Sequence, residues 1–94
     1  MREREIEKWL REQIKYLGGR ALKFTSPGND GVPDRIVFLP GGRIYLIELK
    51  AIGGRLSPIQ VWQQESLRAL GVDVRTITGR AEAEAFIREL RGRR

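Results

Sequence analysis

The chain has 94 residues, and its 18 lysines and arginines outnumber its 12 aspartates and glutamates, which gives a formal net charge of +6 at pH 7. It contains neither histidine nor cysteine, which excludes serine–histidine and cysteine–histidine catalysis as well as a disulfide scaffold. The length predicts a single domain, residues 1–94, and the charge favours a polyanionic partner. No apolar run reaches membrane-spanning length, so we expect a cytoplasmic protein without a membrane partner.

Residues 3–17 are predicted to form an amphipathic helix that Gly18 and Gly19 end. Its apolar stripe consists of Ile6, Leu10, Ile14 and Leu17. Glu3 and Glu7 border this stripe, so each is either a solvated rim residue or an acid that reaches over a sheet toward a site.

Residues 20–25 are predicted to form a strand that contains Lys23. This lysine either discourages pairing at a sheet edge or contacts a nucleic-acid phosphate, and both interpretations remain open. Residues 26–31 form a loop of turn formers, whose glycines would let the backbone approach a phosphate closely. Asp30 lies in that loop, whereas Asp34 begins the next strand, and we therefore prefer Asp34 as the site acid.

A hairpin is predicted over residues 31–50, with an apolar strand on each side of a glycine turn. A two-residue turn would place Asp34 opposite Leu49, on the wrong face. A three-residue loop, Pro40–Gly42, or a one-residue bulge places Asp34 opposite Glu48 instead. We expect the three-residue loop, which brings the two carboxylates onto one face with their Cβ atoms about 5 Å apart.

Glu48 and Lys50 point to the same face of the second hairpin strand, because side chains alternate along a strand. The preceding residues, 44–47, are apolar on both faces, so this strand should be covered on both sides. A buried charge there requires an ion pair, a metal ion or a wet cleft. Two facing carboxylates repel unless a cation lies between them, and Mg²⁺ prefers such oxygen ligands. The residues therefore predict a divalent-metal site on Asp34 and Glu48, with Lys50 beside it.

A second helix, residues 58–70, is expected after a loop that contains Arg55, a candidate phosphate contact. Ser57 is predicted to be its N-cap, and Gln60 completes a capping box. Gln60 therefore has a structural explanation for its position. Trp62 follows the apolar spacing of the helix and is predicted to pack in the core.

The chain continues with a strand, residues 72–77, and a helix, residues 80–90, which Thr78 is predicted to cap. The inner face of this helix should consist of Ala83, Phe86, Ile87 and Leu90. Four arginines are either a solvated end or a contact to a DNA backbone: Arg88, Arg91, Arg93 and Arg94. The element order αβββαβα predicts an α/β fold, a mixed β-sheet flanked by helices on both faces.

This ordered set of motifs resembles the stand-alone VRR-NUC domains of the PD-(D/E)xK nuclease superfamily. Pro-Asp followed by Glu-x-Lys is a weak signal by itself, but the full ordered set is specific. It covers roughly residues 3–87 and consists of Glu7, Gly18-Gly19, Lys23, Ser26-Pro27-Gly28, Gly31-Val32-Pro33-Asp34-Arg35, Glu48-Leu49-Lys50, Ser57-Pro58-x-Gln60 and Leu70-Gly71.

The resemblance implies a Mg²⁺- or Mn²⁺-dependent endonuclease that hydrolyses DNA phosphodiester bonds. Stand-alone members are associated with Holliday-junction resolution as homodimers, so branched DNA and a second copy are the implied partners. The implied catalytic residues are Asp34, Glu48, Lys50, Gln60 and Glu7. The implied metal ligands are the side chains of Asp34, Glu48 and Glu7 and the backbone carbonyl of Leu49. The implied nucleic-acid contacts are Lys23, Arg35 and Arg55.

Two other functions remain open. One is a nuclease directed at flaps or nicks. The other is a non-catalytic basic module that binds nucleic acid and uses Glu48 and Lys50 as an ordinary ion pair. The chain is too small to enclose a duplex and holds no recognisable base-reading module, so structure-specific cutting is favoured over sequence-specific cutting.

Overall fold

A computed structural model of the protein describes residues 2–93. Met1 and Arg94, the last of the C-terminal arginines, lie outside the described residues. The elements follow the predicted order, which confirms the α/β class: α1 (Glu3–Tyr16), β1 (Arg20–Lys23), β2 (Arg35–Leu39), β3 (Arg43–Lys50), α2 (Pro58–Ala69), β4 (Val74–Thr78) and α3 (Gly79–Arg91).

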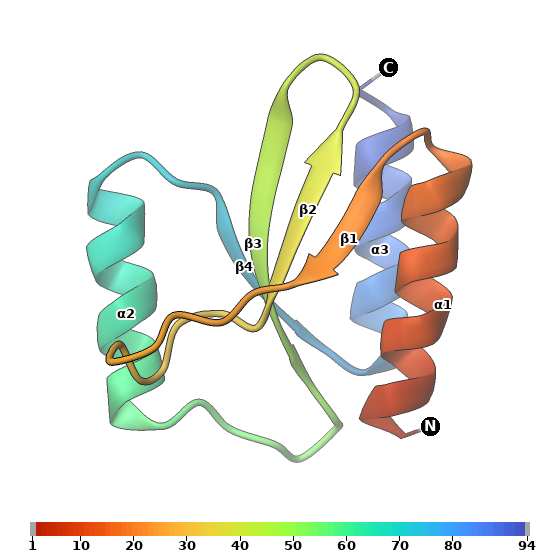
Figure 1. Ribbon diagram of the computed structural model, residues 1–94. Helices are drawn as coiled ribbons and strands as arrows, with labels where there is room; N and C mark the ends of the chain where they lie inside the picture. Colours follow the sequence, from red (N-terminus) through yellow and green to blue (C-terminus); the bar gives the residue numbers. More distant parts are fainter. Residues whose placement is uncertain (1, 94) are drawn as a thin grey trace.

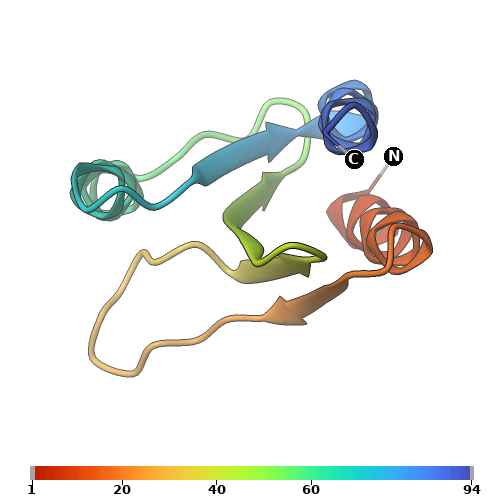
Figure 2. The same ribbon diagram turned by 90° about the horizontal axis from the view of Figure 1, so that it is seen from above.

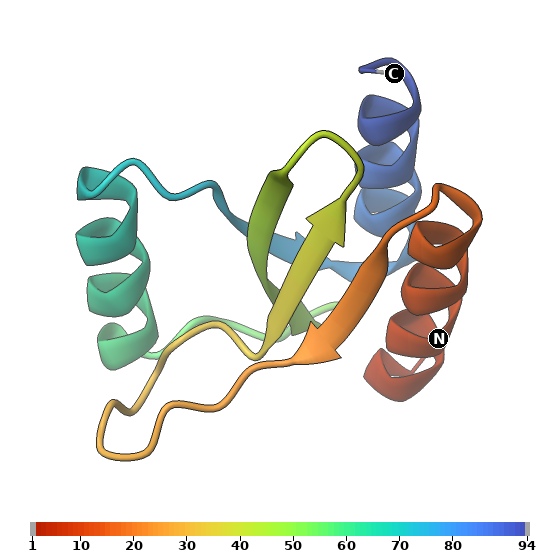
Figure 3. The same cartoon turned by 45° about the horizontal axis from the view of Figure 1, so that its top comes forward.

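The four strands form one mixed sheet in the order β1-β2-β3-β4. β1, β2 and β3 pair antiparallel, whereas β3 and β4 pair parallel. A parallel pair needs a crossover connection, and α2 supplies it. Seen from above, α2 lies on one side of the sheet and the α1–α3 pair lies on the other (Figures 1 and 2). β1 is the outer strand beside α1 (Figure 3).

The main core lies between the sheet and the α1–α3 pair. Alternate residues of β2 and β3, such as Val37 and Ile47, point to this side and are fully buried. The predicted helix stripes are confirmed except at Leu17, which follows the end of α1 and is only partly buried. The buried residues of the two helices are Ile6, Leu10 and Ile14 in α1, and Ala83, Phe86, Ile87 and Leu90 in α3. Tyr45 of β3 meets Phe86 edge to face, with ring centroids 5.3 Å apart.

The second helix, α2, covers the opposite face only beside β4. Its one buried residue is Gln64, whose amide donates to Thr76 Oγ1 at 2.9 Å. Arg68 donates to the carbonyl of Val74 at 2.9 and 3.2 Å. Trp62 is 59% exposed, so the prediction that it packs in the core was wrong. The reason is that polar contacts hold α2 over the β4 edge rather than over the middle of the sheet.

This position of α2 leaves part of the sheet uncovered. Ile44 is 48% exposed, so strand 44–47 is not buried on both faces along its whole length as predicted. Phe38 pairs directly with Ile44 across β2 and β3, and Leu22 of β1 is exposed on the same face. We call Leu22, Phe38 and Ile44 the open apolar patch. Exposed apolar patches on small proteins mark interaction surfaces.

The helix ends follow the predicted signals with one exception. Gly18, with φ of 85°, ends α1 in the left-handed conformation that glycine tolerates. Thr78 is the N-cap residue of α3, but its side chain makes no capping bond. The N–H of Thr78 instead donates to Glu82 Oε1 at 2.8 Å. Among the described residues, no helix has the length and apolar character needed to cross a membrane.

Candidate active site

The hairpin of β2 and β3 has the predicted three-residue loop. Leu39 pairs with Arg43 across Pro40–Gly42, and Arg35 pairs with Ile47 at the other end. Both glycines of the loop have positive φ, 84° and 76°, which only glycine adopts at low cost. Continuing the register by one residue places Asp34 opposite Glu48, on the face that carries α2.

Asp34 lies at the start of β2, held by its backbone carbonyl. That carbonyl accepts hydrogen bonds from the N–H of Phe24 at 2.8 Å and from Arg35 Nη1 at 2.9 Å. One carboxylate oxygen, Oδ2, lies 3.6 Å from Arg35 Nη1. The other, Oδ1, is buried and has no hydrogen-bond partner among the described residues. Buried polar atoms are normally satisfied, so this oxygen lacks a donor or a cation.

Glu48 is the buried acid of the site, with 6% of its surface exposed. Burial, followed by the nearby Asp34 carboxylate, raises the pKa of Glu48 from 4.5 to about 7. Lys50 opposes this shift, and its Nζ lies 3.9 Å from Glu48 Oε2. A single ammonium at that distance does not compensate for the burial of Glu48. The site therefore favours an additional positive charge.

These donors fit a hard divalent cation. Two carboxylates on facing strands offer the oxygen ligands that Mg²⁺ and Mn²⁺ take, and the unpartnered Asp34 Oδ1 is a ready ligand. No group of three or more His, Cys, Asp or Glu residues within residues 2–93 is gathered closely enough to hold a metal ion. Further ligands would have to be backbone carbonyls, such as that of Leu49, or water.

Glu7 and Glu3 line a hollow of about 240 Å³ together with Asp34 and Leu49. Glu7 accepts two hydrogen bonds from Arg11 Nη1, at 2.9 and 3.1 Å. Glu3 is among the charges that raise the pKa of Glu48, whereas Glu7 is not. The structure therefore brings both acids of α1 to the rim of the site, with Glu3 acting electrostatically on Glu48.

Arg35 links α1 to the site, a role that the sequence did not reveal. Its Nε lies 3.5 Å from Glu7 Oε1, and its Nη1 lies 3.6 Å from Asp34 Oδ2. Its side chain is 21% exposed. Arg35 thus binds two acids of the protein itself, and its predicted contact with nucleic acid stays a prediction.

The first turn of α2 is fixed next to the loop that leads to Asp34. Gln60 Oε1 accepts the N–H of Ser57 at 2.8 Å, and Ser57 Oγ accepts the N–H of Gln60 at 3.3 Å, which confirms the capping box. A Cβ added at Gly31 would lie 3.0 Å from backbone atoms of Ile59, so the loop packs closely on the helix. Gln63 also donates to the carbonyl of Asp30 at 2.9 Å.

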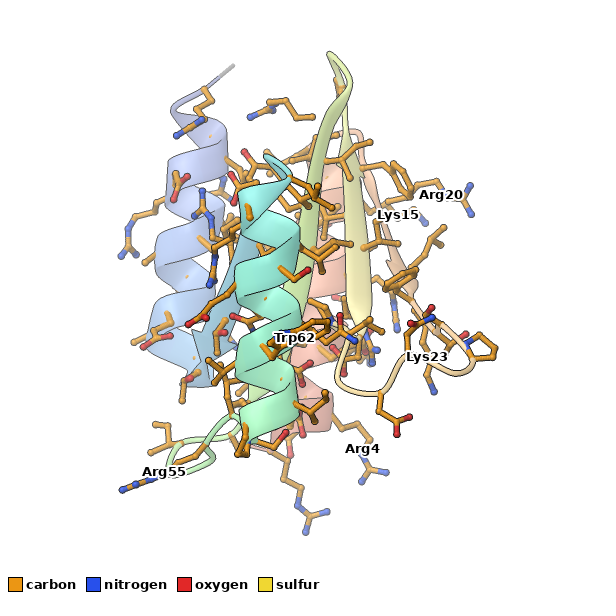
Figure 4. The ribbon with its side chains drawn as sticks, turned by 90° about the vertical axis from the view of Figure 1, so that its left-hand side faces the viewer. Arg4, Lys15, Arg20, Lys23, Arg55 and Trp62 are labelled. Carbon is orange, nitrogen blue, oxygen red and sulfur yellow. The ribbon has the colours of Figure 1, made fainter. Side chains whose placement is uncertain are left out.

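Two of the predicted phosphate contacts are exposed on either side of the site. Lys23 pairs across the sheet with Arg35, at the end of β1 nearest to Asp34. Arg55 projects outward from the loop between β3 and α2 (Figure 4). Neither side chain forms an ion pair within the part of the chain that the structure describes.

Comparisons with known proteins found a similar protein by sequence and a similar solved structure. The chain is 47% identical over 74 residues to the protein named "Putative nuclease p44" of Acyrthosiphon pisum secondary endosymbiont phage 1, which covers 79% of this chain and 80% of the relative. A solved structure described as a VRR_NUC domain is similar with a TM-score of 0.86 and 29% identity, over 92% of this chain and 94% of that one. No family model matches the sequence.

Proposed function

This chain belongs to the VRR-NUC family of nucleases, and on that premise we propose that it is a metal-dependent, structure-specific DNA endonuclease. The observation that carries the proposal is the pair formed by Asp34 and Glu48. Two carboxylates face each other on paired strands, one with a buried unpartnered oxygen and the other with a pKa raised to about 7. Such a pair is costly without a cation and suits a metal-assisted hydrolase.

Each residue of the site has a role that its contacts support. Asp34 and Glu48, with the backbone carbonyl of Leu49, would hold the cation. A bound Mg²⁺ or Mn²⁺ ion supplies a water of lowered pKa and a positive charge beside the scissile phosphate. Lys50 extends from the same strand face as Glu48, so its ammonium would neutralise a phosphate oxygen and orient the attacking water.

Gln60, Arg35 and Glu7 support these groups. The capping box occupies Gln60 Oε1, so only its amide N–H groups remain to donate to water or phosphate. Arg35 fixes Oδ2 of Asp34, which leaves Oδ1 for the cation. Glu7 holds Arg35 in place, and Glu3 is the alternative supporting acid because it acts on the pKa of Glu48.

The decisive experiment compares wild-type protein with Asp34→Asn on labelled junction, fork, flap and linear DNA, with Mg²⁺ and with EDTA. We expect wild type to cleave only with the metal and Asp34→Asn to lose at least about 100-fold in rate, the size of effect expected for a group that positions charge in the transition state. Calorimetry with Mn²⁺ should give a binding isotherm for wild type that Asp34→Asn lacks. Equal cleavage by both proteins would refute the enzyme assignment.

The preferred substrate is a Holliday junction, cut by a homodimer. A two-fold axis would present two sites to the two symmetric strands of a junction. The open apolar patch supports this proposal, because a second copy of the chain would cover Leu22, Phe38 and Ile44. Sedimentation should give a dimer for wild type and a monomer for Phe38→Glu. Preference for flaps or nicks by a monomeric wild type would contradict both parts of the proposal.

A further inference from the structure

Five exposed cations border the candidate site along one side of the molecule. We call them the basic strip: Arg4, Lys8, Lys15, Arg20 and Lys23. The first three lie on one face of α1, because residues three, four and seven apart share a helix face. The last two lie on β1, the edge strand of the sheet. None of the five makes an ion pair within residues 2–93.

The helix half and the strand half of the strip are adjacent. Lys15 and Arg20 line one groove of about 540 Å³ between α1 and β1. Lys15, Arg20 and Lys23 lie along the same edge of the molecule, and Arg4 lies below them (Figure 4). The strip therefore follows one edge of the molecule, with Arg20 and Lys23 on opposite faces of β1 because side chains alternate along a strand.

Both halves of the strip begin at the active site. Arg4 lines the hollow that contains Asp34. Lys23 pairs across the sheet with Arg35, the residue next to Asp34. From there the helix half leads away to Lys15 and the strand half leads away to Arg20. A polyanion that crosses the site would continue along the strip.

The strip contains one repulsive pair on α1, and its nearest acid on the same helix face is Glu12, four residues after Lys8. Like charges four residues apart on a helix destabilise it by about 0.2–0.5 kcal/mol per pair, and Arg4 and Lys8 form such a pair. Arg11 lies between Lys8 and Lys15 and is neutralised by Glu7 at 2.9 Å. Glu12 is the acid that lines the groove, but it forms no ion pair with a residue of the strip. A bound phosphate backbone would remove the remaining repulsion.

We propose that the basic strip binds the phosphate backbone of one duplex arm of the DNA, a proposal that rests on the nuclease function above. Arg4 and Lys15 are eleven residues apart, which corresponds to about 16 Å along a helix with a rise of about 1.5 Å per residue. Because the phosphates of one strand advance about 3.4 Å per base pair, the strip spans about five base pairs. The DNA that the protein cuts should therefore have a paired arm of at least that length beside the cut phosphate.

The test compares the variant Lys15→Gln/Arg20→Gln/Lys23→Gln with a matched control, Arg88→Gln/Arg91→Gln/Arg93→Gln, which removes the same charge from α3. The assay is steady-state cleavage of a junction with Mg²⁺ over a series of salt concentrations. For the strip variant we expect KM to rise at least about tenfold near physiological salt while kcat stays within about twofold. The slope of log kcat/KM against log salt concentration should be smaller in magnitude by up to about 3 for this variant. Each of the three lost phosphate contacts contributes about 0.9 to that slope. The control should keep the wild-type KM, a result that would also assign these arginines to a solvated end of the chain and not to a contact with the DNA backbone.

A second measurement uses junctions with one arm shortened to about two or three base pairs, less than the strip spans. Shortening should lower kcat/KM for wild type and have little effect on the strip variant. Equal losses in the strip variant and the control, or a wild-type KM in the strip variant, would overturn the proposal. If wild type cleaves no DNA with Mg²⁺ or Mn²⁺, the nuclease function fails. The proposal for the strip is then tested by measuring the binding of labelled duplex DNA in EDTA. Only the strip variant should bind the duplex more weakly than wild type.

Discussion

Replacing Glu48 by glutamine should stabilise the metal-free protein at pH 8. Folding raises the pKa of Glu48 from 4.5 to about 7, first through burial and then through Asp34. At about 1.4 kcal/mol per pKa unit, the ionised carboxylate costs the folded state about 3 kcal/mol. Glutamine has nearly the same shape and no charge. Glu48→Gln should therefore raise the free energy of unfolding by about 2–3 kcal/mol, less the cost of burying its amide.

The sign of the pH dependence follows from the direction of the shift. Below pH 4.5, Glu48 is protonated in both states and contributes no difference. As pH rises from 4.5 to about 7, the unfolded chain releases this proton while the folded protein keeps it, so wild type loses stability over this window. Above that window the loss is complete. Glu48→Gln should lack this decline.

The assay is urea unfolding followed by tryptophan fluorescence, in EDTA, for both proteins at pH values below, within and above this window. The difference in free energy of unfolding should be near zero at the lowest pH and reach its full value at pH 8. Adding Mg²⁺ at 100 times its Kd should cancel this difference, because a ligand at that concentration stabilises a folded protein by about 2.7 kcal/mol, and only wild type should bind it. A difference between the two proteins that does not change with pH would refute the reasoning.

Three further predictions concern stability. Gly19→Ala should destabilise the protein by at least about 2–3 kcal/mol in urea unfolding, because its Cβ would lie 2.3 Å from the Phe38 carbonyl oxygen. Gly28→Ala meets no atom within 4 Å and should cost only the roughly 1–2 kcal/mol of its positive φ. Arg75→Ala should cost about 1–2 kcal/mol at pH 7, after allowance for solvent screening, because Arg75 bonds Asp73 at 2.6 Å and Glu89 at 2.8 Å. Because Arg75 lowers the pKa of Glu89, the cost of Arg75→Ala should shrink as the pH falls and Glu89 is protonated. A cost that stays the same in acid would contradict this prediction. Ser57→Ala should cost about 1 kcal/mol by removing the cap of α2, with Ser57→Thr as the variant that retains it.

Local features of the fold could be predicted from the sequence. The stripes of α1 and α3 follow helical spacing, and the capping box of α2 involves residues three positions apart, so neighbours along the chain decide both. The pairing of Asp34 with Glu48 was also predictable. It depends on the length of one turn, and Pro40–Gly42 suits a three-residue loop.

Packing between distant segments could not be predicted from the sequence. The spacing of Trp62 is that of a buried helix residue, yet the side chain is exposed because α2 rests on β4 through Gln64 and Arg68. The same placement of α2 exposes Ile44, whose strand is apolar on both faces. A periodic pattern identifies the apolar face of an element but not the surface that covers it.

The sequence by itself determined the order of the elements, the register of the hairpin and the three charges at its end. These follow from side-chain alternation, helical spacing and turn geometry, all of which act over a few residues. Only the tertiary structure decided that Arg35 joins Glu7 to Asp34, that α2 does not cover the open apolar patch, and that cations of α1 and β1 share one edge. Those relations depend on how close separate elements come, and many arrangements of the same elements satisfy the same local patterns.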